Sequence, residues 1–322
     1  MKKLAITIGF LASPVLLSAQ IRYYDSLFQE VDKITEVYTS KDTVDLAMDI
    51  FTPNNDQDTL RPVLLYVHGG GFQGGRRDEP AQIAFFEGFA KKGFVTATMS
   101  YTFVRKGLGF SCETPAHEKV ETFLLTARDV SRATRYLVTH HERLGIDTSQ
   151  IILLGSSAGA EAILHAAYWK ETFADESGRI LSDSFKYAGV VSMAGAIVST
   201  DWITQESAIP TQLFHGTCDN LVPYGHASHH YCDQSEAGFL MLHGARSISE
   251  HLAEIGKPYY LVTGCYGRHE WNITPIQFYQ NKIRDFLYFD ILQGKSRQTH
   301  EIISLDTVDP CESYNSFNFC NQ

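Results

Sequence analysis

The sequence predicts an α/β fold, with a mostly parallel central sheet, helices on both faces and small cap-like insertions. Residues 62–67 form a nearly continuous apolar run, which is typical of a strand buried on both faces. Strand-like and helix-like runs then alternate along most of the chain, which indicates parallel strands joined by helices. Two of these strands run directly into glycine-rich loops, at the end of a sheet where such folds bind ligands.

The individual elements follow from residue patterns. Residues 34–40 and 44–51 are rich in β-formers on either side of a short polar turn, which predicts an antiparallel hairpin. Further strands are expected at residues 62–67, 94–99, 150–154, 190–193, 210–214 and 258–262. Helices are expected at residues 79–92, 118–141, 158–169, 247–255 and 275–292. The segments 170–186, 195–209 and 224–245 interrupt the alternation, and we expect them to wall a pocket.

The domain organisation predicted is a signal peptide followed by one domain. Residues 1–19 contain Lys2 and Lys3, an apolar run over 4–17, and the small residues Ser18 and Ala19, in the order of a cleaved signal peptide. The apolar run is short for a membrane span of about 20 residues, although an uncleaved anchor is the alternative. We expect a secreted or periplasmic protein with no membrane span in the mature chain. Residues 20–322 form a single domain with a polar C-terminal tail from about residue 293.

Six cysteines lie in the predicted mature chain. An even number in an exported protein favours disulfide bonds, although six cysteines allow fifteen pairings. Local spacing favours Cys218–Cys232 and Cys311–Cys320, which leaves Cys112–Cys265. The cysteines have neither C-x-x-C spacing nor the Cys/His clustering of a metal site, so no metal is expected.

The segment Gly155-Ser156-Ser157-Ala158-Gly159 has the form G-x-S-x-G. It follows a short apolar strand and opens a predicted helix, which is the context in which such a serine is a nucleophile. The glycines permit a sharp turn that holds the Ser157 hydroxyl above the sheet, and the Ala158 N–H points into the same space. A motif this short occurs by chance in roughly one chain in eight of this length, and a Gly/Ser turn that caps a helix is the alternative. A second signal is therefore needed.

That signal is His68-Gly69-Gly70-Gly71-Phe72, directly after the buried strand over residues 62–67. A run of glycines lets the backbone approach a ligand closely and direct its N–H groups at an anion. The anion expected here is the tetrahedral oxyanion formed when a serine attacks a carbonyl carbon. We expect His68 to shape this loop rather than to react.

These two motifs, in this order and spacing, resemble the carboxylesterase and hormone-sensitive-lipase-like branch of the α/β-hydrolase superfamily, over about residues 44–292. The resemblance implies that Ser157 is the nucleophile and that Gly70, Gly71 and Ala158 supply the oxyanion-binding N–H groups. It also implies that the acid and the histidine follow in the order Ser, Asp or Glu, His.

The acid predicted is Asp219. It lies just after the strand at residues 210–214, in a stretch that resembles the HG-x-x-D-x-x-VP sequence of esterases and prolyl-oligopeptidase-like hydrolases. A turn aspartate that caps local backbone is the alternative. Asp201 and Asp233 are weaker rivals because neither follows the end of a strand so directly.

The base predicted is His269, in the loop after the last predicted strand, where the family that the sequence resembles keeps its histidine. Five further histidines are expected at the surface or lining a pocket, and His226 is a binding candidate because it is close to Asp219 in sequence. The rivals of His269 are His229, His230, His243, His251 and His300.

Aromatic residues near the motifs are candidates for substrate binding. Phe72, Tyr101 and Tyr224 are the main candidates, with Phe103 and Phe110 as further ones, although aromatic side chains belong more often to the core. Tyr101 lies in a Ser-Tyr-Thr stretch where many members of the similar family have Tyr-Arg-Leu, so contacts of this loop are not carried over.

Together these residues predict a secreted serine carboxylic ester hydrolase that forms an acyl-enzyme and needs no metal or organic cofactor. Expected substrates are small-molecule esters with short acyl groups, or acetyl and feruloyl groups linked to plant polysaccharide. A serine peptidase of the same fold and a non-catalytic binding protein on this fold are the alternatives. The formal net charge of −10 disfavours nucleic acid as a partner.

Overall fold

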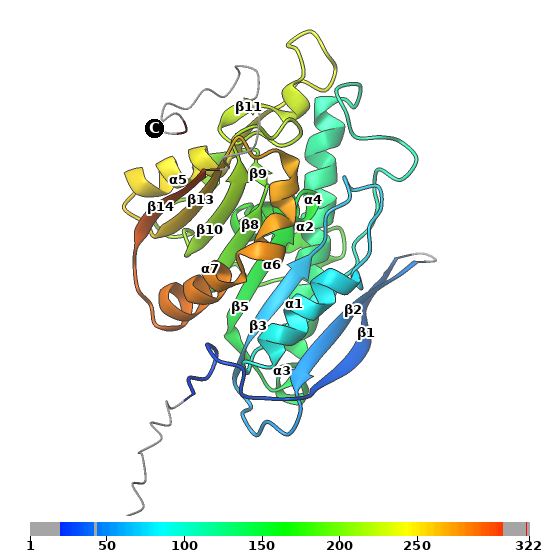
Figure 1. Ribbon diagram of the computed structural model, residues 1–322. Helices are drawn as coiled ribbons and strands as arrows, with labels where there is room; N and C mark the ends of the chain where they lie inside the picture. Colours follow the sequence, from blue (N-terminus) through cyan, green and yellow to red (C-terminus); the bar gives the residue numbers. More distant parts are fainter. Residues whose placement is uncertain (1–19, 42–43, 305–319, 321–322) are drawn as a thin grey trace, which may run out of the picture.

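The computed structural model describes residues 20–41, 44–304 and 320, so the predicted signal peptide lies outside the described residues. A nine-stranded sheet crosses the molecule in the order β1-β2-β4-β3-β5-β8-β10-β13-β14 (Figure 1). The β1–β2 and β2–β4 pairs are antiparallel, and the other pairs are parallel. The strands are β1 (Val31–Lys41), β2 (Val44–Pro53), β3 (Arg61–Val67), β4 (Val95–Met99), β5 (Ile146–Ser156), β8 (Gly189–Met193), β10 (Thr211–Gly216), β13 (Tyr259–Cys265) and β14 (Gln298–Ser304).

Helices cover both faces of this sheet, and each face has its own hydrophobic core. One face packs against α2 (Ala116–Thr139), α3 (His141–Leu144), α4 (Ala158–Tyr168) and α5 (Ala245–Glu254). The other packs against α1 (Pro80–Ala90), α6 (Thr274–Phe278), α7 (Gln280–Asp285) and the π-helical η5 (Phe286–Leu292). The predicted α/β fold class is confirmed.

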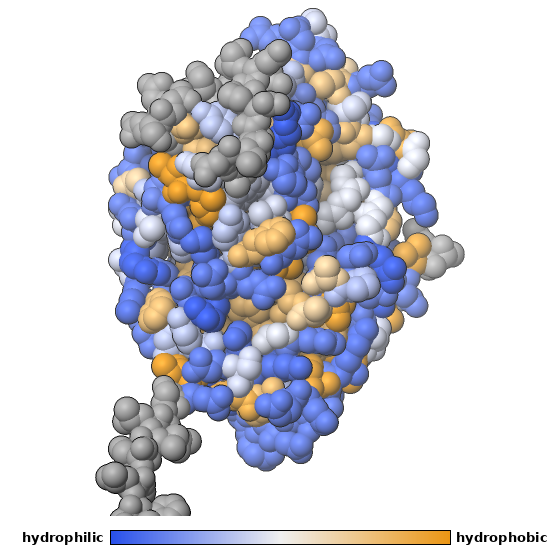
Figure 2. All heavy atoms as spheres, in the orientation of Figure 1, coloured by the Kyte–Doolittle hydropathy of each residue, from blue (hydrophilic) through white to orange (hydrophobic). Residues whose placement is uncertain are grey.

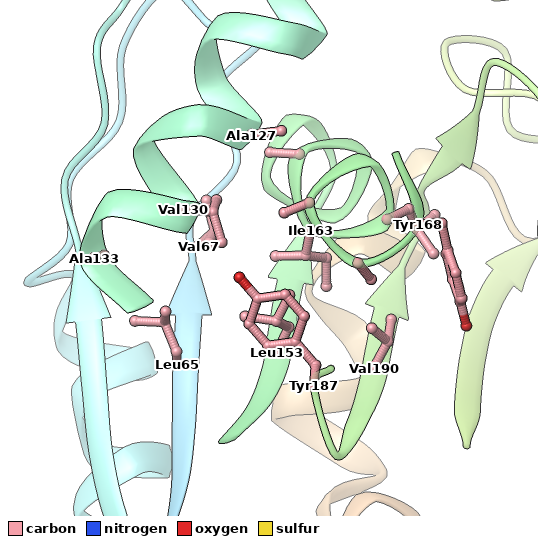
Figure 3. Close-up of a cluster of buried hydrophobic side chains, with 14 of the residues drawn as sticks. Leu65, Val67, Ala127, Val130, Ala133, Leu153, Ile163, Tyr168, Tyr187 and Val190 are labelled. Atoms are coloured by element: carbon pink, nitrogen blue, oxygen red, sulfur yellow. The ribbon is translucent and has the colours of Figure 1, made fainter. Parts of the chain in front are cut away.

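Strand β3 shows why the apolar run over residues 62–67 is informative. Every residue of β3 is buried. Leu65 and Val67 contribute to the core beneath α2 and α4, whereas Leu64 and Tyr66 contribute to the opposite core. Figure 3 shows Val67 beside Val130 of α2, with Leu65 farther along the same strand. Alternate side chains point to opposite faces of a strand, so a strand between two helical layers is apolar at every position.

The segments predicted to interrupt the alternation form small structures of their own. Residues 170–186 contain η1 (Lys170–Phe173), β6 (Ala174–Asp175) and β7 (Gly178–Arg179). The other two segments meet in a three-stranded sheet of β11 (His226–Ser228), β12 (Met241–Gly244) and β9 (Ala196–Ile197). The turn η3 (His229–Tyr231) follows β11, and η2 (Thr200–Trp202) follows β9. We call β9, β11, β12 and η3 the cap.

The predicted disulfide pairing is wrong. Cys112 is bonded to Cys232, with an S–S distance of 2.09 Å, and Cys265 is bonded to Cys320, with an S–S distance of 2.04 Å. Local spacing favoured near neighbours, but the fold brings together residues 120 and 55 positions apart. The first bond ties Cys232, the residue directly after η3 of the cap, to the loop between β4 and α2. The second ties the end of β13 to a residue of the predicted tail.

Two predictions for the C-terminal part are also corrected. The helix expected over residues 275–292 is divided into α6, α7 and η5. The tail expected from about residue 293 contains β14, which pairs in parallel with β13 along its length. Exposed and half-buried residues alternate in β14, and its only apolar residues are Ile302 and Ile303, so this edge strand has the composition of a polar tail.

The other edge of the sheet is β1. Its pairing with β2 shifts register between Val37 and Thr39, which marks a β-bulge or similar irregularity.

Polar residues dominate the face of the molecule drawn in Figure 2, with hydrophobic residues scattered among them. In the part of the chain that the structure describes, no helix is long and apolar enough to cross a membrane.

Candidate active site

Ser157 occupies a sharp turn between β5 and α4. Its backbone has φ 53° and ψ −124°, a strained conformation for a residue with a side chain. The turn leaves no room for a side chain at Gly159, since a Cβ atom there would lie 2.1 Å from the carbonyl oxygen of Val67. The G-x-S-x-G spacing therefore reflects close backbone packing of α4 against β3, and it leaves the serine at the N-terminus of α4.

The structure brings Ser157, His269 and Asp219 together from three separate loops. The Ser157 Oγ lies 2.8 Å from Nε2 of His269, and Nδ1 of His269 lies 2.8 Å from Oδ2 of Asp219. An ionised carboxylate only accepts hydrogen bonds. Nδ1 therefore carries the hydrogen, and Nε2 accepts from the serine hydroxyl. This is the arrangement needed to remove a proton from a serine that attacks an acyl carbon.

Asp219 is fully buried and held by several donors. Its Oδ1 accepts hydrogen bonds from the backbone N–H groups of Leu221 and Val222 at 2.9 and 3.0 Å. Burial acts to raise the pKa of Asp219, but hydrogen bonds from His215 and His269 hold it well below its ordinary range. The carboxylate is thus ionised at neutral pH and can orient the imidazole of His269.

Sequence reasoning missed Asn272 as a supporting residue. The Ser156 Oγ donates to the Asn272 carbonyl at 2.7 Å, and the Asn272 side chain donates to the His269 carbonyl. These bonds join the turn that carries Ser157 to the 3₁₀ turn η4 (His269–Asn272). Its only sequence signal is a polar residue three positions after His269.

The glycine loop after β3 lies beside Ser157. A Cβ atom on Gly69 would lie 3.1 Å from that of Ser157, so the loop and the serine are in close approach. Gly70 has φ +132°, and Gly71 has φ +60°. Among the described residues, the N–H groups of Gly70 and Gly71 form no hydrogen bond. The Ala158 N–H lies in the first turn of α4, where backbone donors have no partner within the helix.

The side chain of His68 packs between the glycine loop and Tyr101. Its ring stacks on Tyr101 with 4.6 Å between centroids, and its Nδ1 lies 2.7 Å from the Gly69 carbonyl oxygen. The imidazole is buried, which lowers its pKa. His68 is therefore placed as a neutral framework residue, as its position in the loop suggested.

A cavity of about 900 Å³ opens above Ser157. Its wall includes Gly70, Gly71, Phe72, Phe110, Ser157, Ala158, Glu161, His229, His230 and His269. Tyr101 and Tyr224, two of the predicted substrate-binding residues, do not line it: Tyr101 lines a separate cavity, and Tyr224 is buried with its hydroxyl 2.7 Å from Thr263 Oγ1. Both aromatic rings are used in packing.

The rival acids lie elsewhere. Asp233 is exposed and accepts hydrogen bonds from Ser235, and Asp201 is exposed in η2. The rival histidines divide into two sets. His229 and His230 line the cavity, whereas His251 bonds the Ile203 carbonyl and His300 bonds Thr263. The ring of His243 lies tilted against that of the binding candidate His226 in the cap.

The described residues contain one group of candidate metal ligands, Cys112, Cys232 and Glu236, in which the two cysteines are bonded to each other.

The sheet order, the serine at a strand–helix turn and the glycine loop define an α/β-hydrolase. Residues 48–246, more than half of the chain, match the BD-FAE family model. The chain belongs to this family.

Two curated relatives have esterase names. Gut esterase 1 of Caenorhabditis elegans is 27% identical over 145 residues, which cover 45% of this chain and 24% of that protein. Fumonisin B1 esterase of Sphingopyxis macrogoltabida is 32% identical over 134 residues, which cover 39% of this chain and 23% of that protein. The match thus spans about a quarter of each relative.

Similar solved structures include an esterase from Thermogutta terrifontis. Its butyrate-bound form has a TM-score of 0.59 at 21% identity, covering 81% of this chain and 94% of that one. The same enzyme phosphorylated by paraoxon has a TM-score of 0.58 at 20% identity, with the same coverage. At this identity the likeness supports the fold.

Proposed function

We propose that this protein is a carboxylic ester hydrolase that works through an acyl-enzyme on Ser157. The observation that carries the proposal is the hydrogen-bonded series Ser157–His269–Asp219 at the edge of a cavity bounded by the glycine loop. The esterase names of the curated relatives support the same reaction class.

The reaction begins when His269 Nε2 takes the proton from Ser157 as its oxygen attacks the acyl carbon. Asp219 keeps the imidazole in the required tautomer and stabilises the imidazolium. The N–H groups of Gly70, Gly71 and Ala158 bind the oxyanion, and the loss of one such donor costs about 3–4 kcal/mol of barrier in comparable sites. His269 then protonates the leaving alcohol, and a water molecule activated by the same imidazole releases the acid.

Export is part of the proposal. The charged and apolar pattern of residues 1–19 supports a cleaved signal peptide, and the disulfide bonds support an oxidising compartment. Acetyl and feruloyl esters on plant polysaccharide, and small short-acyl esters, are the proposed substrates. N-terminal sequencing of the protein from the periplasm and the medium tests export: an intact Lys2-Lys3 segment would contradict it.

The purified protein should hydrolyse p-nitrophenyl acetate and react covalently with a fluorophosphonate probe. Ser157→Ala should abolish labelling and lower kcat by a factor of about 10⁴–10⁶. Ser184→Ala, at an exposed serine, is the matched control and should retain both properties. A wild-type protein that neither labels nor hydrolyses esters would instead support a binding function.

A further inference from the structure

The cavity wall contains polar residues that ester hydrolysis itself does not use. Glu161 lies one helical turn after Ser157 on α4, and its backbone N–H donates to the Ser157 carbonyl at 3.0 Å. His229 and His230 reach the same cavity from the cap. Two segments far apart in sequence therefore place a carboxyl group and two imidazoles near the nucleophile.

Glu161 and His229 are buried without full hydrogen bonding. Their side chains are 2% and 1% exposed. The Glu161 Oε1 lies 3.4 Å from His229 Nε2, yet neither this oxygen nor His229 Nδ1 has a hydrogen-bond partner among the described residues. Buried polar groups are nearly always paired, so an unpaired set facing a cavity indicates a ligand.

The cap holds these imidazoles in place. The His229 N–H donates to the Leu240 carbonyl at 2.8 Å, and the His230 N–H donates to the Leu221 carbonyl at 2.9 Å. His230 and Tyr231 both have positive φ angles, of 58° and 54°. Such strain is typical of ligand-binding positions, and here it is locked by the neighbouring bond between Cys232 and Cys112.

Burial disfavours the charged forms of Glu161, His229 and His230. Burial raises the pKa of Glu161 well above its ordinary value, with a further contribution from Asp219 and an opposing one from Lys119. Burial lowers the pKa of His229 and that of His230 to about 4. Lys119, the nearby cation, donates to the Gly238 carbonyl at 2.8 Å and is not among the residues that line the cavity.

A protonated carboxyl group and a neutral imidazole each offer one donor and at least one acceptor. A hydroxyl group, which both donates and accepts, matches this pair. The ring of Phe110 lies 5.2 Å from the His229 ring, centroid to centroid, and provides an apolar surface beside the polar one. Building on the proposed ester hydrolysis, we propose that Glu161 and His229 form a subsite that hydrogen-bonds a hydroxyl group of the substrate.

The hydroxyl can belong to the acyl part or to the alcohol part of the ester, and paired substrates separate these sources. Methyl p-coumarate against methyl cinnamate tests an acyl hydroxyl. A monoacetate of methyl β-xyloside against cyclohexyl acetate tests hydroxyls on the alcohol. In one of these pairs the wild type should prefer the hydroxylated ester in kcat/KM by at least about tenfold. A preference below twofold in both pairs would overturn the proposal without any variant.

Variants then assign the preference to the subsite. Glu161→Met should reduce the ratio of kcat/KM within the preferred pair to about one, because it removes both hydrogen-bonding atoms. Glu161→Gln keeps a donor and an acceptor and should restore most of the ratio. Glu121→Met, at an exposed position of α2, is the matched control and should leave the ratio unchanged. An unchanged ratio in Glu161→Met would overturn the assignment.

Failure of this inference and failure of the proposed function give different results. A protein that hydrolyses p-nitrophenyl acetate and labels with fluorophosphonate, but shows no preference for hydroxylated esters, keeps its esterase function and loses the subsite. A protein inactive in all of these assays contradicts both.

Discussion

His215 Nε2 lies 3.2 Å from Oδ2 of Asp219, the same oxygen that accepts a hydrogen bond from His269. The same nitrogen lies 3.1 Å from the Val222 carbonyl oxygen. Because both neighbours are acceptors, Nε2 carries a hydrogen that it shares between them. His215 therefore links the Asp219 carboxylate to the backbone of Val222 in the same loop.

The first prediction concerns this support. His215→Phe removes the donor and should lower kcat for p-nitrophenyl acetate by about 10–100-fold, with KM little changed, because Asp219 loses a partner that orients it. His215→Gln retains an N–H and should recover part of the rate. His141→Phe, at an exposed histidine, serves as the control. Equal losses in the Phe and Gln variants would argue against a positioning role.

The second prediction compares two glycines. Gly159→Ala places a methyl group 2.1 Å from the Val67 carbonyl oxygen and should destabilise the protein by about 1–3 kcal/mol or more, with loss of activity. Gly88→Ala, in α1, meets no atom within 4 Å and should stabilise the protein by about 0.5–1 kcal/mol. Urea unfolding measures both changes. A Gly159→Ala variant as stable as the wild type would contradict the packing described for α4.

The third prediction follows from the raised pKa of Glu161. A raised pKa means that, as the pH rises, the unfolded state releases the Glu161 proton before the folded state does, since an ordinary Glu has a pKa of about 4.3. The contribution of Glu161 to stability is therefore fully present below the pKa of the unfolded state. It is lost as the pH rises from that value through the raised pKa of the folded state.

Glu161→Gln removes this pH-dependent loss. The quantity to compare is the unfolding free energy of the variant minus that of the wild type. This difference should be more favourable to the variant at pH 7 than at pH 4, by an amount on the order of 1–3 kcal/mol. Urea unfolding at both pH values measures it, with Glu121→Gln as the exposed control. The same difference at pH 4 and pH 7 would show that Glu161 is ionised in the folded state.

The fourth prediction concerns the bond between Cys112 and Cys232. The double variant Cys112→Ala/Cys232→Ala should lose about 2–5 kcal/mol of stability, and its cap should be cleaved faster by a protease because the cap loses its tie to the loop before α2. Cys265→Ala/Cys320→Ala removes the bond at the end of β13 and should leave cap cleavage unchanged. Unaltered cleavage in the first variant would show that packing alone holds the cap.

The parts of the fold that could be predicted have strong local signals. Residues 62–67 indicate a doubly buried strand because every position is apolar, and the glycines around Ser157 mark a turn that needs their small size. Asp219 and His269 could be placed by their position after a strand. In each case a few neighbouring residues carry the information.

The features that were missed depend on contacts between distant segments. The partner of Cys232 depends on the cap lying over the loop before α2, which spacing does not reveal. β14 lies at the edge of the sheet and contains only two apolar residues, Ile302 and Ile303, so it resembles a polar tail. Glu161 did leave a signal: it is a charged residue in a predicted helix whose neighbours are almost all apolar, and α4 is buried along its whole length.

The register shift in β1 affects whether two copies of the protein can pair edge to edge through their sheets. An edge strand exposes unpaired backbone groups that can recruit a strand from another chain, and natural sheets prevent this with irregular pairing and charged side chains. β1 has both, since Asp32, Lys33 and Glu36 lie on it before the shift at Val37. Edge-to-edge growth of the sheet is thereby discouraged on this side, which favours a dispersed protein at high concentration.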